Sequence, residues 1–174
     1  MGNKKFKNKK KENFINNLPK LDLETSKIEK RCKFNFSYFD PSQSAGQDFK
    51  DWDNQDKLSS LSELLNKIKN YSKEALSYWR HQKVGTGKYR LNILEYYEKF
   101  PLNSDFRHPN HVPHDVIWAR FRLGYKVRLV GFVIPDEFAL NDHLNQDKEF
   151  KFDQNTFYVV FLDKDHHFYT TEME

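Results

Sequence analysis

The stretch VIWARFRLGYKVRLVGFVIP, at residues 116–135, constrains the fold more than any other part of the sequence. Apolar and polar residues alternate on both sides of the Gly-Tyr-Lys loop at 124–126, which is the pattern of two strands that each bury one face. An even-numbered loop would place Phe121 opposite Arg128, so the three-residue loop is favoured. This register gathers the apolar residues of both strands on one face: Ala119, Phe121, Leu123, Val127, Leu129, Gly131 and Val133.

Two helices are expected before this hairpin. Asp53 is the predicted N-cap of the first, because its side chain can accept hydrogen bonds from the free N–H groups of a first turn. The apolar residues of this helix recur every three or four positions and form one stripe: Leu58, Leu61, Leu64, Leu65, Ile68 and Tyr71. Ser72 begins a shorter helix, with Ala75, Leu76 and Trp79 on its inner side.

Further strands are expected at both ends of the chain. Residues 33–39 alternate aromatic and polar side chains, whereas 156–162 are apolar on both faces, which is typical of a central strand. A tight turn at 163–165 precedes a last short strand at 166–170, which returns beside 156–162. Residues 91–101 fit either a strand or a helix, and a short helix is favoured. The order of elements lacks strand–helix–strand alternation, so the predicted class is α+β, an antiparallel sheet with helices packed on one face.

Charge divides the chain into a basic tail and a domain. Residues 1–31 hold ten Lys and Arg against four acidic residues, a net charge of +6. Residues 32–174 hold 19 basic and 21 acidic residues, a net charge of −2. The Lys- and Asn-rich tail has few apolar residues, so 1–31 is predicted to be disordered and 32–174 to form a single domain. The tail is either a solubilising extension or a loose contact to polyanions.

The cysteine content, the hydropathy and the motifs of the sequence disfavour several classes of protein. Cys32 is the sole cysteine, which excludes an internal disulfide and a multi-cysteine zinc site. The sequence has no run of 18 apolar residues, and no apolar region follows the basic N-terminus, so neither a membrane span nor a secretory signal is predicted. Gly85 and Gly87 do not precede Lys-Ser/Thr at the spacing of a phosphate loop. We expect a cytoplasmic protein with no cofactor and no membrane partner.

The hairpin register has an electrostatic consequence. It places Arg122 opposite Arg128, with Arg120 on the same face, and like charges directly opposite each other cost up to about 1 kcal/mol. One interpretation is that nearby carboxylates neutralise the arginines, and the candidates are Asp163, Asp165 and Glu172. The other is an anion site, since the guanidinium fork binds phosphate at two points. Trp118 shares this face and is a candidate for stacking on a base.

The final predicted strand carries His166, His167 and Tyr169. In a strand only one of the two histidines can face the arginines, and His167 lies on the same side as Tyr169. A histidine titrates near neutral pH and serves as a general base or acid. These residues therefore indicate either a proton-transfer site or a polar edge strand that resists aggregation.

Three further histidines, His108, His111 and His114, are spaced three positions apart. Pro109 and Pro113 exclude a regular helix there. A loop can still gather histidines around zinc, but the only nearby carboxylate belongs to the residue after His114, so no metal is expected and ordinary loop histidines are favoured.

The stretches KVRLVGFV and FYVVFLDKDHHFY resemble the RelE/ParE superfamily of bacterial toxins, over roughly residues 33–39, 55–82 and 118–170. The resemblance implies a RelE-like fold and metal-independent cleavage of mRNA on translating ribosomes. It also implies RNA or the ribosome, and an antitoxin-like protein, as partners. Residues 83–117 and 136–155 have no counterpart in that family.

Carried onto this chain, the resemblance assigns proton transfer and phosphate stabilisation to three catalytic residues, namely His167, Tyr169 and Arg128. It also assigns phosphate binding to Arg120 and Arg122. The full set of predicted substrate-binding residues adds Trp118, Lys126 and Lys164. The alternative function is a non-catalytic module that binds nucleic acid or protein through the basic face of the sheet.

Overall fold

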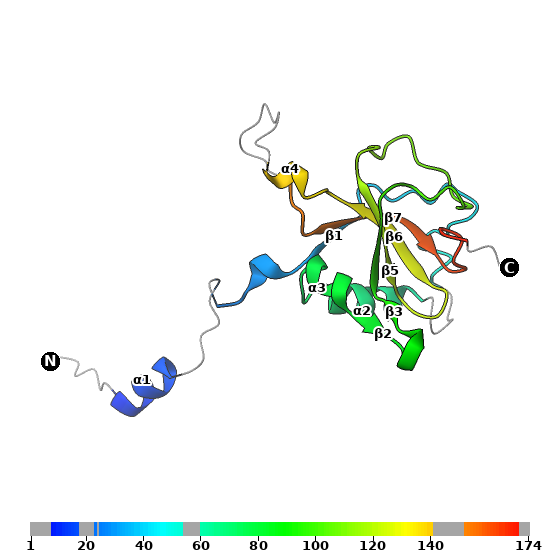
Figure 1. Cartoon of the computed structure of the whole chain (residues 1–174). Coiled ribbons are helices and arrows are strands. Elements are labelled where there is room, and N and C mark those ends of the chain that lie inside the picture. The colour runs from blue at the N-terminus through cyan, green and yellow to red at the C-terminus, as the bar shows by residue number, and fades with distance from the viewer. Residues whose placement is uncertain (1–7, 18–22, 24, 54–59, 141–151, 171–174) are drawn as a thin grey trace.

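The computed structural model describes residues 8–17, 23, 25–53, 60–140 and 152–170 (Figure 1). Its helices are α1 (Lys9–Asn16), α2 (Leu61–Tyr71), α3 (Leu76–His81) and α4 (Glu137–Leu140), with 3₁₀ turns at Ile28–Lys30 and Gly87–Tyr89. Its strands are β1 (Lys33–Asn35), β2 (Lys83–Val84), β3 (Leu91–Asn92), β4 (Leu94–Tyr97), β5 (Ile117–Arg122), β6 (Arg128–Val133) and β7 (Thr156–Asp163).

The sheet has five strands in the order β1-β7-β6-β5-β4, and β2 and β3 form a separate small hairpin. The predicted α+β class is confirmed, and the interior place of β7 agrees with its apolar faces. The prediction of a purely antiparallel sheet is wrong, because β1 runs parallel to β7, with Lys33 beside Thr156. A three-residue strand carries no signal of its direction, so the sequence alone could not give this pairing.

The register predicted for the central hairpin is confirmed. Ala119 pairs with Gly131, and Arg122 pairs with Arg128. On the other side of β6, a bulge shifts the register between Val130 and Gly131, so that β7 has one residue more than β6 at this point.

Residues 91–92 and 94–97 are strands, and the prediction of a helix there is wrong. β4 pairs with β5, which sets Leu94 opposite Phe121 and Tyr96 opposite Ala119. Leu94 and Tyr96 face the helices, whereas Tyr97 packs in the cluster on the other face. The apolar residues of this stretch therefore follow a period of two, and pairing with β5 selects the strand.

Helices α2 and α3 cover one face of the sheet, as predicted. The N-cap of α2 is Ser60 and not Asp53, and its hydroxyl accepts a hydrogen bond from the Glu63 N–H at 3.2 Å. Of the predicted stripe, Leu64 is buried and Leu65 is exposed. Leu58 lies outside the described residues. The helix-side core consists of these buried residues: Cys32, Trp52, Leu64, Tyr71, Leu76, Trp79, Leu94, Ala119, Phe121, Leu123, Val127, Leu129, Val133, Phe157, Val159 and Leu162.

Loops cover the opposite face of the sheet. Trp118, Phe132 and Phe161 form a second core there with Phe106 and Phe168, which come from loops. The prediction that 166–170 forms a strand beside β7 is wrong, since these residues have no strand structure. The segment instead bonds to another loop: the Asp105 N–H donates to the His167 carbonyl, and the Thr170 N–H donates to the Asn103 carbonyl. The face that was expected to be open is therefore largely covered.

The basic tail contains helix α1, which lies apart from the sheet (Figure 1). The side chains of Lys9, Lys10 and Lys11 on it are exposed. Disorder of residues 1–31 stays a prediction. Within the described parts of the chain, no helix has both the length and the apolar character that crossing a membrane requires.

Candidate anion-binding site

The three arginines of the hairpin lie on one face of β5 and β6, and none of them forms an ion pair with a described residue. Arg122 and Arg128 are directly opposed, and Arg120 is two residues before Arg122 on β5. Throughout residues 60–140 and 152–170, no ion pair joins any of the three to a carboxylate. Asp165 forms no ion pair there either, and Glu172 lies outside the described residues. No carboxylate therefore forms an ion pair with the arginines among the described residues, although the charges of Asp163 and Glu95 partly offset the lowering of the pKa of Arg128 and Arg122.

The two carboxylates that stand opposite the arginines in the sheet are engaged elsewhere. Asp163 pairs with Arg128 in register but is fully buried, and it accepts hydrogen bonds at 3.0 Å from the backbone N–H groups of His167 and Phe168. Burial raises the pKa of Asp163. Glu95 pairs with Arg120, yet its carboxylate accepts a hydrogen bond from the Asn92 side chain at 3.0 Å.

Arg128 is the most buried of the three, with 3% of its surface exposed. Its Nη1 donates hydrogen bonds to the carbonyls of Gly124, Tyr125 and Val127 at 3.0, 2.9 and 2.9 Å. Its Nε is buried and has no partner among the described residues. Burial, followed by the charges of Arg122 and Arg120, lowers the pKa of Arg128 to about 9. Arg128 therefore supports the β5–β6 turn, a structural role that the sequence did not indicate.

The histidine that reaches the arginines is His166, whereas the sequence favoured its neighbour. The Nε2 atom of His166 is a hydrogen-bonding neighbour of Nη1 of Arg120. Its φ of 68° lies in the left-handed region, which takes the chain out of the extended geometry assumed for a strand. Burial first, and then Arg120 and Arg128, lower the pKa of His166 to about 4. This imidazole is therefore neutral at pH 7, with its Nε2 lone pair toward Arg120.

The side chains of His167 and Tyr169 have different partners in the structure. The Nδ1 atom of His167 lies 3.9 Å from a carboxylate oxygen of Asp105, on the loop side. Tyr169 stacks on Tyr97 at 5.5 Å between ring centroids, and the guanidinium of Arg120 lies 5.8 Å from the Tyr97 ring. The hydroxyl of Tyr97 is buried without a described partner, and burial raises its pKa to about 12. Sequence reasoning missed Tyr97 because it placed this stretch in a helix.

The remaining predicted binding residues lie in three different environments. Trp118 is 1% exposed and packs edge to face on Phe100 at 4.9 Å, so its ring has no free face for a base. The Lys164 amine donates a hydrogen bond to the Asp51 carbonyl and lies 5.7 Å from the Trp52 ring, which belongs to the helix-side core. Lys126 is exposed on the β5–β6 turn, beside the arginines in sequence.

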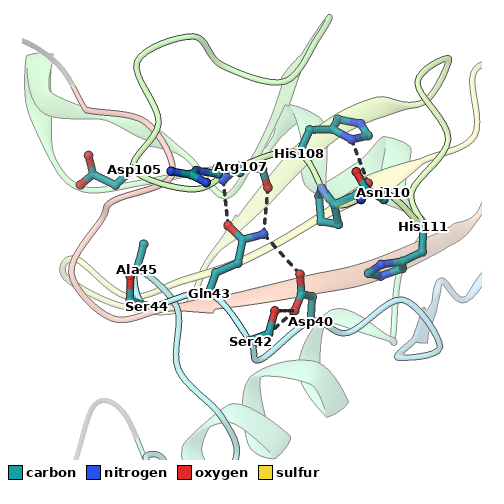
Figure 2. Close-up of a pocket in the computed structure, with 11 residues that line it drawn as sticks. Asp40, Ser42, Gln43, Ser44, Ala45, Asp105, Arg107, His108, Asn110 and His111 are labelled. Carbon is teal, nitrogen blue, oxygen red and sulfur yellow. Dashed lines mark hydrogen bonds between the residues drawn. The ribbon is translucent and has the colours of Figure 1, made fainter.

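A polar pocket of about 830 Å³ lies between loops 40–45 and 105–111, and two of the three spaced histidines line it (Figure 2). Gln43 joins the two loops: its amide oxygen accepts from the Arg107 N–H at 2.8 Å, and its Nε2 donates to the Arg107 carbonyl at 2.9 Å. The pocket carries both acidic and basic side chains, and its walls are fixed by these bonds.

The histidines at 108, 111 and 114 do not converge. His108 and His114 stack at 4.4 Å between ring centroids, whereas the Nε2 atom of His111 lies 3.1 Å from the Tyr38 carbonyl. Burial lowers the pKa of His108. In the described segments, no three His, Cys, Asp or Glu side chains come together in a way that could hold a metal ion.

The most specific arrangement is therefore the arginine cluster, defined as Arg120, Arg122 and Arg128, with His166, Tyr97 and Tyr169 around it. Comparison of the chain with family models, with curated proteins and with solved structures found no match to any of them.

Proposed function

We propose that the protein binds the phosphate groups of single-stranded RNA through the arginine cluster. The observation that carries this proposal is the opposed Arg122–Arg128 pair with Arg120 beside it, none of which has an ion pair among the residues described. A bound anion removes the repulsion between these side chains, and arginine stays charged while its planar fork matches two phosphate oxygens.

The charges around the cluster favour a polyanion over an isolated anion. Arg120 and Arg122 are partly exposed, whereas Arg128 is buried, so the first two are the side chains that a phosphate chain meets. Lys126 adds an exposed cation on the adjacent turn. Burial, and after it the neighbouring arginines, lowers the pKa of both Arg122 and Arg128, so an anion stabilises the charged forms of both.

Replacing Arg120 and Arg122 together with Gln tests this proposal. The slope of log affinity against log salt for single-stranded RNA is expected to flatten by about 1.4, since each lost phosphate contact removes about 0.7. Fluorescence anisotropy over a salt series measures this slope. The control is Arg107→Gln, which removes one positive charge in the polar pocket and should leave the slope unchanged. Equal slopes for the parent and the double variant would exclude the arginine cluster as the binding site.

RNA cleavage is the second candidate function, and the neutral His166 favours it. In this proposal the 2′-hydroxyl displaces Arg120 from Nε2 of His166, which then accepts the hydroxyl proton as general base, while the arginines stabilise the developing charge. Tyr169, stacked on Tyr97, is a hydroxyl-bearing side chain of the same C-terminal segment. In this proposal His166 takes the role that the family resemblance assigned to His167.

The His166→Ala variant is expected to lower cleavage of mRNA on translating ribosomes by about 10²–10⁴-fold, the usual contribution of a general base. Because the pKa of His166 is about 4, the parent rate should stay level near neutral pH and fall only as the pH approaches 4. EDTA should have no effect. His167→Ala is the matched control, and a loss of cleavage in this variant alone would restore the sequence-based assignment. No cleavage under any condition would leave RNA binding as the sole function proposed.

A further inference from the structure

An aromatic pocket of about 610 Å³ lies where the β5–β6 turn, the β2–β3 hairpin and helices α2 and α3 meet. Tyr71 and Trp79 form its floor together with Ile93 and Leu123. Tyr71 and Trp79 are 5% and 8% exposed, and their rings meet edge to face at 5.0 Å, so the floor is closely packed. A cavity of this size with aromatic walls is typical of sites for flat organic groups.

The rim of the aromatic pocket is unusually apolar for a surface. Val84, Leu91 and Tyr125 all line it, and 44%, 49% and 79% of their surfaces are exposed. Water-exposed apolar groups that gather at one cavity mark a binding surface. The backbone carbonyl of Tyr125 accepts hydrogen bonds from Arg128 and Arg122, so the turn that carries this ring is held beside the arginine cluster.

Two cationic residues, Lys67 and Arg122, also line the aromatic pocket. Arg122 belongs to the arginine cluster as well, where its charge acts on Arg128. The pocket is therefore complementary to a ligand in which an aromatic group is linked to an anionic group. Lys67 already lies 3.7 Å from a carboxylate oxygen of Glu63, whereas Arg122 has no ion pair among the described residues. An apolar peptide segment matches the floor but leaves Arg122 without an anion, whereas a nucleotide matches both.

We infer that the aromatic pocket binds an unstacked base of single-stranded nucleic acid whose phosphates lie on Arg120 and Arg122. The inference rests on the proposed binding of RNA phosphate and adds a second, base-dependent contribution to it. Tyr125 supplies an exposed face on which a base can stack, and such stacking tolerates any base because every base has a π-face. The site is thus expected to bind a chain that carries bases more tightly than an abasic chain, with little preference for the identity of the base.

An abasic chain separates the two contributions, because it keeps the phosphates and lacks the bases. Affinity is measured by fluorescence anisotropy for a labelled RNA of about 12 nucleotides and for an abasic chain of equal length, both within the range of single-strand sites. The parent is expected to bind the RNA at least about fivefold more tightly, the lower limit of the effect of one stacked base. Tyr125→Ala should abolish this preference, and Tyr125→Trp should keep it.

The control variant is Phe152→Ala, which removes another exposed aromatic ring, 45% exposed and in contact with Phe138. It should leave the preference for bases unchanged. If the parent binds both chains equally, or if Tyr125→Ala weakens both equally, base binding is overturned while phosphate binding stands. A preference that survives Tyr125→Ala also overturns it, and assigns the pocket to another ligand such as an apolar segment of a protein. If neither chain binds, the proposed function itself fails.

Discussion

Replacing Gly131 with Ala is expected to unfold the domain or to lower its free energy of unfolding by at least about 3 kcal/mol, the upper end for an overfilled core. A Cβ atom at this position would lie 2.0 Å from the Tyr158 carbonyl oxygen and 2.8 Å from Cε1 of Phe157. Both obstacles belong to β7, and one of them is backbone, so no rotamer change removes the clash. The cause is the bulge between Val130 and Gly131, where β7 crosses close to β6.

Urea denaturation followed by circular dichroism measures this loss. Gly87→Ala is the matched control, because a Cβ there meets nothing within 4 Å and only its positive φ of 61° opposes the change. That control should cost about 1 kcal/mol. A Gly131→Ala variant as stable as the Gly87→Ala variant would show that β6 and β7 are further apart than described.

The second large effect is expected from Arg128→Met. Methionine keeps the apolar stem but removes the donor to the carbonyls of Gly124, Tyr125 and Val127. It also removes the cation that is paired in register with Asp163 and interacts with its charge. A buried polar group left without its partner costs about 1–3 kcal/mol, so a loss of about 3 kcal/mol is expected for this variant.

Arg122→Met is the informative comparison, since it removes the opposed charge without removing a short hydrogen bond. The described contacts of Arg122 with carbonyl oxygens are both 3.5 Å long. Its loss relieves repulsion on Arg128, so its free energy of unfolding should stay the same or rise. The opposite order of stability would mean that Arg122 supports the turn and that Arg128 is free to contact a ligand.

The sequence predicted those features that depend on local pattern. The hairpin register follows from alternation on both sides of a three-residue turn, and this led directly to the opposed Arg122–Arg128 pair. The apolar faces of β7 likewise indicated an interior strand. A buried face with period two specifies register strongly, because a slip of one residue would expose every apolar side chain.

The features that sequence reasoning missed depend on contacts between distant segments. His166 faces Arg120 because its left-handed φ turns the chain after β7. No pattern in the sequence predicts this turn. Tyr97 joins the site only because pairing with β5 makes its stretch a strand. Trp118 was placed on the correct face, but the loop residues that cover it, Phe100 and Phe168, are brought there by the tertiary fold.

The parallel pairing of β1 with β7 has a consequence for the order in which the chain folds. Lys33 and Asp153, which meet at the start of this pair, are 120 positions apart in sequence. The hairpin of β5 and β6 can close as soon as its residues leave the ribosome, whereas β1 has no strand to join until β7 has been made. Closing so long a loop carries an entropic penalty and slows folding. During synthesis, therefore, β1 and the aromatic residues that follow it stay unpacked until β7 is made. Pairing of β1 with β7 is the last step in forming the sheet.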